Sequence, residues 1–157
     1  TLAGNRLESI EPVGALPALL SLDVSENQLA SLDAVTARLR FLQVLRARSN
    51  RLTAAPAAPA EGVESVLREL DLSANALTTV DGIERFGALR TLALRETGLA
   101  QIGALGSLRA LATLDLAENA LEGLEALAPL AGCPALSELT LESNAVTEAD
   151  YYKNEVL

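Results

Sequence analysis

The stretch LRELDLSANAL, residues 67 to 77, places four leucines around a single asparagine, Asn75. Two of the leucines, Leu70 and Leu72, alternate with polar residues, which is the period of a strand with one buried face. An asparagine that follows such a strand lies where the chain turns away from it. Its amide can bond backbone groups that the turn leaves unpaired, because buried polar groups need partners.

The same spacing recurs along nearly the whole chain. It is found in LLSLDVSENQL (19–29), LQVLRARSNRL (42–52), LRTLALRETGL (89–99), LATLDLAENAL (111–121) and LSELTLESNAV (136–146), and its second half opens the chain as TLAGNRL. By subtraction, successive positions of this asparagine lie 22 to 25 residues apart when Thr97, which stands at one of them, is counted. A period of this length indicates a solenoid, in which each unit buries one face against its neighbours.

The polar positions are predicted to form a structural asparagine ladder along the inside of this solenoid. Its members are Asn5, Asn27, Asn50, Asn75, Asn119 and Asn144. Thr97 stands at the remaining position and offers only a hydroxyl in place of an amide. The repeat of Thr97 is therefore predicted to be the weakest position of the ladder.

The spacing resembles the leucine-rich repeat, L-x-x-L-x-L-x-x-N-x-L, in six near-complete copies and one partial copy. Further apolar residues follow at steps of three, as at Leu77, Val80 and Ile83, which suits 3-10 segments. This is similar to the short 22-residue-period class, typified by the nuclear regulatory subunit of type-one protein phosphatase. The resemblance implies an α/β solenoid, a horseshoe with a parallel β-sheet on the concave face and 3-10 or short helical segments on the convex face.

We expect residues 1–157 to form a single leucine-rich repeat domain of about seven repeats, the first of them partial. The final VTEADYYKNEVL resembles the start of the C-terminal cap of eukaryotic intracellular leucine-rich repeat proteins, with matches at Tyr152, Lys153 and Val156. The start of a cap helix is therefore expected over 147–157, with a plain amphipathic helix as the alternative. Because the chain opens inside a repeat, further residues are expected before it.

The composition disfavours several classes of function. The chain has no histidine, one cysteine, 21 acidic and 12 basic residues, and a net charge of −9. Without histidine there is no ready general base near neutral pH and no imidazole ligand, so we expect no enzyme activity, metal or cofactor. The excess of acids disfavours direct contact with nucleic acid or with anionic membranes. The lone Cys133 is expected to be a buried core residue, and no small-molecule substrate is expected.

Function is therefore expected at the outward positions of the strands. The position between the two strand leucines reads Thr1, Asp23, Arg46, Asp71, Ala93, Asp115 and Thr140. This row and three neighbouring rows hold nine acids (Asp23, Glu26, Glu69, Asp71, Glu96, Asp115, Glu118, Glu138 and Glu142) and three bases (Arg46, Arg48 and Arg95), a net charge of 3 − 9 = −6. The predicted concave face is thus acidic with an arginine island, and the alternative is a solvated polar face without a partner.

The predicted partner is a basic protein segment or helix, attracted by the acidic face. The partner-binding residues are predicted to be Arg46, Arg48, Arg95, Asp23, Glu69, Asp71, Asp115 and Glu118. Arg46 is expected to lie between Asp23 and Asp71, where cross-strand pairs of opposite charge are favourable.

Three classes of function remain. The first is a non-catalytic docking or scaffold module in a larger intracellular assembly, as resemblance to the leucine-rich repeat proteins of cilia and axonemes implies. The second is a regulatory subunit of an enzyme such as a protein phosphatase, or an acidic nuclear leucine-rich phosphoprotein. The third is a secreted internalin-like adhesin, which the cap-like tail disfavours. The expected location is the cytoplasm, with the cilium or nucleus as alternatives, because no apolar run approaches the roughly 18 residues of a membrane span and no basic segment opens a secretory signal.

Overall fold

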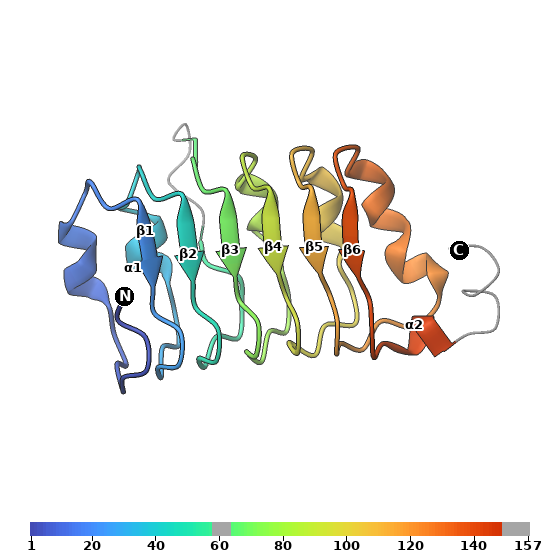
Figure 1. Cartoon of the computed structure of the whole chain (residues 1–157), viewed down its shortest axis with the longest axis horizontal. Coiled ribbons are helices and arrows are strands. Elements are labelled where there is room, and N and C mark those ends of the chain that lie inside the picture. Colours follow the sequence, from blue (N-terminus) through green and yellow to red (C-terminus); the bar gives the residue numbers. More distant parts are fainter. Residues whose placement is uncertain (58–63, 149–157) are drawn as a thin grey trace.

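The computed structural model describes residues 1–57 and 64–148 of the chain. In these residues six short strands follow one another in chain order, and each pairs in parallel with the next. They are β1 (Ser21–Asp23), β2 (Val44–Arg46), β3 (Glu69–Asp71), β4 (Thr91–Ala93), β5 (Thr113–Asp115) and β6 (Glu138–Thr140). Figure 1 shows them side by side along the long axis of the molecule, so that one strand of each repeat contributes to a single open sheet.

Short helices connect most of the strands on the opposite side of the sheet (Figure 1). They are η1 (Glu11–Ala15), α1 (Asp33–Thr36), η2 (Ile83–Arg85), η3 (Gly103–Ser107), η4 (Leu124–Gly132) and α2 (Ala145–Glu148). Those labelled η are 3-10 helices, in which side chains three positions apart lie above one another. Ile83 and Leu105 of these helices are buried, as the threefold apolar spacing predicts.

The register of the sheet places the strand leucines in line. Leu45 pairs with Leu70, Leu70 with Leu92, and Leu92 with Leu114. These four leucines are at most 1% exposed, and full burial of one such side chain stabilises the fold by about 1.5–3 kcal/mol. In β6 the equivalent Leu139 is 41% exposed, and β6 pairs with only one strand in the described part of the chain.

The partial first repeat follows the same rule. The N–H of Leu2 donates to the carbonyl of Asp23, and the N–H of Gly4 donates to the carbonyl of Ser25. The opening residues therefore lie beside β1 as the next element of the sheet. At the other end α2 stops at Glu148, and the cap helix predicted over 147–157 falls almost entirely outside the described residues.

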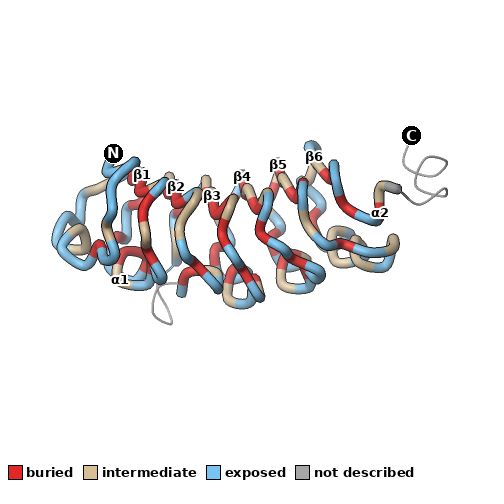
Figure 2. Tube along the Cα trace, turned by 90° about the horizontal axis from the view of Figure 1, so that it is seen from below, coloured by how far each residue is buried: buried red, intermediate tan, exposed pale blue. Residues whose placement is uncertain are grey.

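A single core runs through the interior of the molecule, and Figure 2 shows its buried residues continuing from repeat to repeat. The parallel sheet on one side and the 3-10 and short helical segments on the other confirm the predicted α/β solenoid of leucine-rich repeat type. The outward side of β1–β6, the predicted concave side, is called the sheet face below.

Candidate functional site

Most turns that leave a strand are held from inside by a side-chain amide, as Asn75 illustrates. Its Nδ2 donates to the carbonyls of Leu72 at 2.8 Å and Ser73 at 3.2 Å in its own repeat. The same nitrogen donates to Ala47 of the preceding repeat at 3.0 Å, and Oδ1 accepts the N–H of Leu52 there at 3.0 Å. Asn75 is only 5% exposed, so it joins two repeats at a position from which water is largely excluded.

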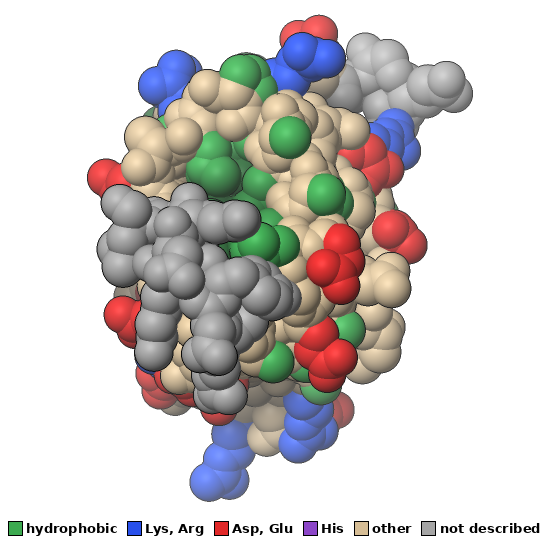
Figure 3. Space-filling model, turned by 90° about the vertical axis from the view of Figure 1, so that its right-hand side faces the viewer, with side chains coloured by type: hydrophobic (Ala, Val, Ile, Leu, Met, Phe, Trp, Pro, Cys, Tyr) green, Lys and Arg blue, Asp and Glu red, His purple; other side chains and the backbone are tan. Residues whose placement is uncertain are grey.

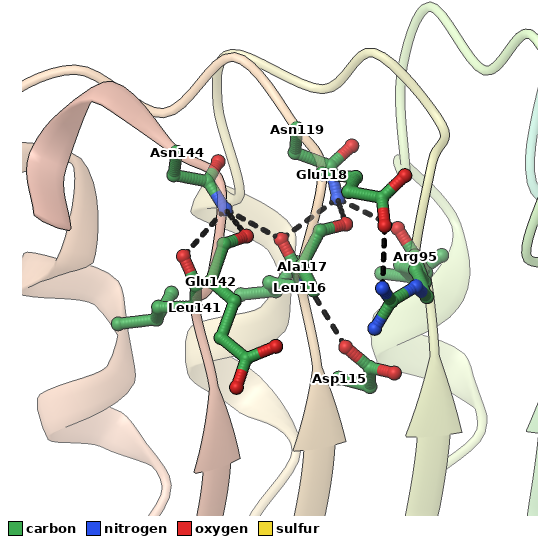
Figure 4. A network of polar contacts seen from close by, with 10 residues as sticks. Arg95, Asp115, Leu116, Ala117, Glu118, Asn119, Leu141, Glu142 and Asn144 are labelled. Atoms are coloured by element: carbon green, nitrogen blue, oxygen red, sulfur yellow. Dashed lines mark hydrogen bonds and ion pairs between the residues drawn. The ribbon is translucent and has the colours of Figure 1, made fainter.

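The other asparagines repeat this pattern, with one exception. Asn27, Asn50, Asn119 and Asn144 each donate to their own turn and to the preceding repeat. Figure 4 shows this for Asn119 and Asn144, both of which donate to the carbonyl of Leu116. Asn5 is exposed and bonds only the carbonyls of Leu2 and Ala3.

Thr97 replaces this arrangement with a local one. Its Oγ1 lies 2.8 Å from the carbonyl of Leu94 and 2.8 Å from Oδ1 of Asn119. The single hydroxyl hydrogen can serve only one of these acceptors at a time. In the part of the chain that the structure describes, the N–H of Leu77 has no acceptor, and the following Gly98 takes a left-handed φ of 78°.

Three aspartates occupy the same position of the sheet face in alternate strands: Asp23 in β1, Asp71 in β3 and Asp115 in β5. Their Oδ1 atoms accept the N–H groups of Ser25, Ser73 and Ala117 at 2.9 to 3.0 Å. The bond from Ser25 is the largest cause that holds the pKa of Asp23 below its ordinary value, and Arg46 adds to it. The strand ends thus orient these carboxylates.

Arg46 lies in register between Asp23 and Asp71, as predicted, but it forms its ion pair with a different acid. Its Nη2 lies 2.6 Å from Oε1 of Glu69, two residues before Asp71 on β3. The short aspartate side chains are engaged by the strand-end N–H groups, whereas the longer Glu69 is within diagonal reach of the neighbouring strand. The predicted position of Arg46 between the two aspartates is thus observed, and its ion pair with Glu69 is an additional contact.

Arg95 forms an ion pair with Glu118 of the next repeat, as Figure 4 shows, and this contact raises the pKa of Arg95 above its ordinary value. Glu118 does not lie on a strand. Like Glu26 and Glu96, it occupies the turn after the strand with φ near 55°. These three acids therefore line the rim where the strands end. They lie beside the predicted acidic face and not on the strands that form it.

The predicted arginine island is split. Arg46 lies in β2 and Arg48 two residues later, whereas Arg95 follows β4, two strands away, about 10 Å at 4.8 Å per strand. Ser73 occupies the same row between Arg48 and Arg95, yet it is buried, as is Ala117 further along the row. Both small residues lie between neighbours with longer side chains. Ser73 and Ala117 therefore do not contribute exposed side chains to this row, contrary to the prediction.

The sequence interpretation missed a regular backbone feature. The residue before each ladder position from Asn27 onward has a left-handed φ of 53° to 57°, at Glu26, Ser49, Ala74, Glu96, Glu118 and Ser143. Gly4, with φ of 69°, holds the equivalent position in the first repeat and was the available signal. The left-handed residue turns the chain inward, so that the asparagine amide reaches the interior.

The described ranges, 1–57 and 64–148, also bear on metal and membrane sites. They contain no cluster of three or more residues suited to holding a metal ion, and no helix there is long and apolar enough to cross a membrane. Cys133 is buried, its Sγ donates to the carbonyl of Leu105, and burial raises the pKa of the thiol.

This chain was compared in sequence and in structure with known proteins, and the similarities are as follows. No family model matches the chain. Mouse transforming growth factor beta activator LRRC32 is 38% identical over 110 residues, which cover 64% of this chain and 16% of that protein. A leucine-rich repeat protein of Leptospira interrogans superimposes with a TM-score of 0.79 and 27% identity, over 99% of this chain and 39% of that one. The chain has the leucine-rich repeat fold.

An internalin of Listeria monocytogenes, InlF, is similar to this chain in fold alone. The TM-score is 0.63 with 22% identity, over 90% of this chain and 47% of that one. The chain spans less than half the length of each of these three proteins.

Proposed function

We propose that this leucine-rich repeat protein is a protein-interaction module that binds a basic segment or helix of a partner on the sheet face. The observation that carries the proposal is the row of Asp23, Asp71 and Asp115 in alternate strands. Each carboxylate is already held by a strand-end N–H, so little side-chain freedom remains to be lost on association.

The spacing of the row indicates which partners fit. Alternate strands lie about 10 Å apart, twice the usual 4.8 Å. Residues seven positions apart on an α-helix are separated by about 10.5 Å along the axis. Residues three positions apart on a polyproline II segment lie on one side of it, about 9 Å apart. A partner with basic residues at either spacing would place one cation against each carboxylate.

The relatives support a protein partner in general terms. The mouse relative is named as an activator of transforming growth factor beta, and solenoids use extended concave surfaces for binding. We propose a docking or scaffold role within a larger assembly. A cytoplasmic, ciliary, axonemal or nuclear location and a regulatory role beside a protein phosphatase stay predictions, and a secreted internalin-like adhesin is the alternative.

The test is a comparison of three baits in affinity capture from cell extract, with quantitative mass spectrometry. Asp71→Asn/Asp115→Asn removes two charges from the sheet face but keeps an oxygen that can accept each strand-end N–H. The control, Glu122→Gln/Glu125→Gln, removes two charges from exposed residues at and before η4, on the helical side.

With folding matched by circular dichroism, partners should be depleted about tenfold from the first variant, as expected for the loss of about 1.4 kcal/mol. The control variant should retain them. Identical partner lists for all three baits would contradict the proposal that partners bind on the sheet face.

A further inference from the structure

A second surface lies along the edge of the sheet where the strands begin. Leu20, Gln43, Arg68 and Arg90 each directly precede a strand, and backbone bonds place them next to one another. The N–H of Gln43 donates to Leu20 at 2.8 Å, that of Arg68 to Gln43 at 2.8 Å, and that of Arg90 to Arg68 at 2.9 Å. These residues form a continuous row at the upper edge of the molecule in Figure 1.

Large apolar side chains are exposed at this edge. Leu20 is 55% exposed, and Phe41 and Val66, which occupy the same position of adjacent repeats directly before the first leucine, are 59% and 39% exposed. The chain's other phenylalanine, Phe86, is buried at 1% exposed, whereas Phe41 lies on the surface. Neighbouring exposed apolar side chains rimmed by polar groups are typical of interaction sites.

Three exposed arginines, Arg40, Arg68 and Arg90, accompany the apolar residues. None of the three takes part in an ion pair within the described residues, whereas Arg46 and Arg95 each pair with a glutamate. Figure 3 shows Lys and Arg side chains at the top of the molecule, where the strands of Figure 1 begin, together with some Asp and Glu, and shows further Lys and Arg at its bottom. In a chain of net charge −9, this edge is a local basic region.

The acids of the sheet face do not cancel this region. Asp71 lies three residues after Arg68, about 10 Å along an extended strand, and the Debye length at physiological salt is about 8 Å. The nearer Glu69 is engaged by Arg46. A ligand at this edge therefore experiences chiefly the arginines, with Glu64 as the acid closest to Val66 in the described sequence.

We propose that this entry edge, defined by Leu20, Arg40, Phe41, Val66, Arg68 and Arg90, is a second docking surface for an acidic protein segment that carries an apolar side chain. The carboxylates of the segment pair with Arg68 and Arg90, since the guanidinium fork binds carboxylate through two hydrogen bonds. Its apolar side chain covers Phe41 and the adjacent Leu20 and Val66. Charge selects the partner, because the sheet face would repel the same segment.

Fluorescence anisotropy with two labelled synthetic peptides tests the proposal on the full chain. One peptide alternates glutamate with leucine, and the other replaces each glutamate by lysine. Arg68→Glu/Arg90→Glu should weaken binding of the acidic peptide at least tenfold, about 1.4 kcal/mol. The matched control, Arg6→Glu/Arg51→Glu, makes the same charge change at exposed turns after Asn5 and Asn50 and should leave the affinity within about twofold.

Two further arms separate the alternatives. Phe41→Ser should weaken the acidic peptide severalfold without loss of folding, because Phe41 is exposed. Asp71→Asn/Asp115→Asn should weaken only the basic peptide, so failure of the sheet-face proposal is distinguishable from failure of this one. The proposal is overturned if the acidic peptide does not bind, if both arginine variants bind it equally, or if the edge arginines bind only single-stranded oligonucleotide or anionic vesicles.

Discussion

The repeats that carry Asn75 and Thr97 are neighbours in the chain, yet they hold their turns differently. Asn75 reaches Ala47 in the repeat before it and accepts the N–H of Leu52. Thr97 makes no hydrogen bond to the repeat before it, and the N–H of Leu77 has no acceptor in the described chain. At that junction, strand pairing, leucine packing and the bond from the N–H of Ala74 to the carbonyl of Arg95 remain between the repeats.

The contrast between the bonds of Asn75 and of Thr97 shows that the asparagine acts between repeats as well as within one. The stability of a solenoid is approximately a sum of repeat terms and neighbour-interface terms, so one missing amide weakens one junction without unfolding the array. The neighbouring residues adapt to the loss. Oδ1 of Asn119 accepts the N–H groups of Thr97 and Leu99 and is within reach of the Thr97 hydroxyl, and Gly98 adopts a left-handed φ.

The largest effect is expected for Asn75→Ala, which removes the amide from an intact junction. Buried groups left without a partner cost about 1–3 kcal/mol each, so the free energy of unfolding in urea should fall by about 3 kcal/mol. Asn5→Ala is the matched control, because Asn5 is exposed and bonds only its own turn, and it should cost under about 1 kcal/mol. Equal losses in the two variants would contradict the interface role.

The adapted turn is tested next by Gly98→Ala. A Cβ disfavours the left-handed backbone by about 1–2 kcal/mol, and Gly98 has φ of 78°, so urea denaturation should show a loss of that size. Gly87→Ala is the control, because Gly87 has no left-handed φ and open space around it. Its effect should stay within about 0.5 kcal/mol. A smaller loss for Gly98→Ala than for Gly87→Ala would show that the left-handed glycine is not required.

A double-mutant cycle tests whether the repeat of Thr97 can adopt the hydrogen bonds of the asparagine ladder. Thr97→Asn should stabilise the chain by about 1 kcal/mol, because an amide can reach Leu72 and the N–H of Leu77. Thr97→Asn/Gly98→Ala should be more stable than the sum of the single changes by about 0.5–1 kcal/mol, since it recreates the Asn-Ala order of residues 75 and 76. Strict additivity in urea denaturation would mean that the turn at Gly98 does not depend on Thr97.

The smallest effect concerns the outward carboxylates, which differ between the same two repeats as Asp71 and Ala93. For Asp23 the folded pKa is below its ordinary value, chiefly through the N–H of Ser25. Its stabilisation is therefore present above the unfolded pKa of about 3.9 and is lost as the pH falls through the folded pKa. Between pH 7 and pH 2 the wild type should lose up to about 1 kcal/mol more than Asp23→Asn. Parallel pH profiles of unfolding free energy would contradict this.

The sheet register was predictable because each strand carries its leucines at a fixed offset from its asparagine. A slip of one residue would turn Leu70 and its equivalents from the core to solvent, and the structure places these leucines opposite one another. The helices follow from the threefold spacing, whose residues, such as Ile83 and Leu105, are buried.

The surface was less predictable, because it depends on which groups are already engaged. The partner of Arg46 is Glu69 because the strand-end N–H groups hold the aspartates. Ser73 is buried although its row faces outward, and this depends on neighbours that a single repeat does not reveal. The entry edge was not predicted, because the repeat pattern assigns the strand positions and leaves the positions before them free, although Phe41 is one of only two phenylalanines in the sequence.

Amide hydrogen exchange of the native protein tests whether the asparagine amides join each repeat to the one before it. The N–H groups of Leu29, Leu52 and Leu121 each donate to the asparagine of the next repeat, whereas that of Leu77 has no acceptor in the described chain. We expect Leu77 to exchange at least about tenfold faster than these three, because local opening at its junction costs less free energy. Protection of Leu77 equal to theirs would contradict this expectation.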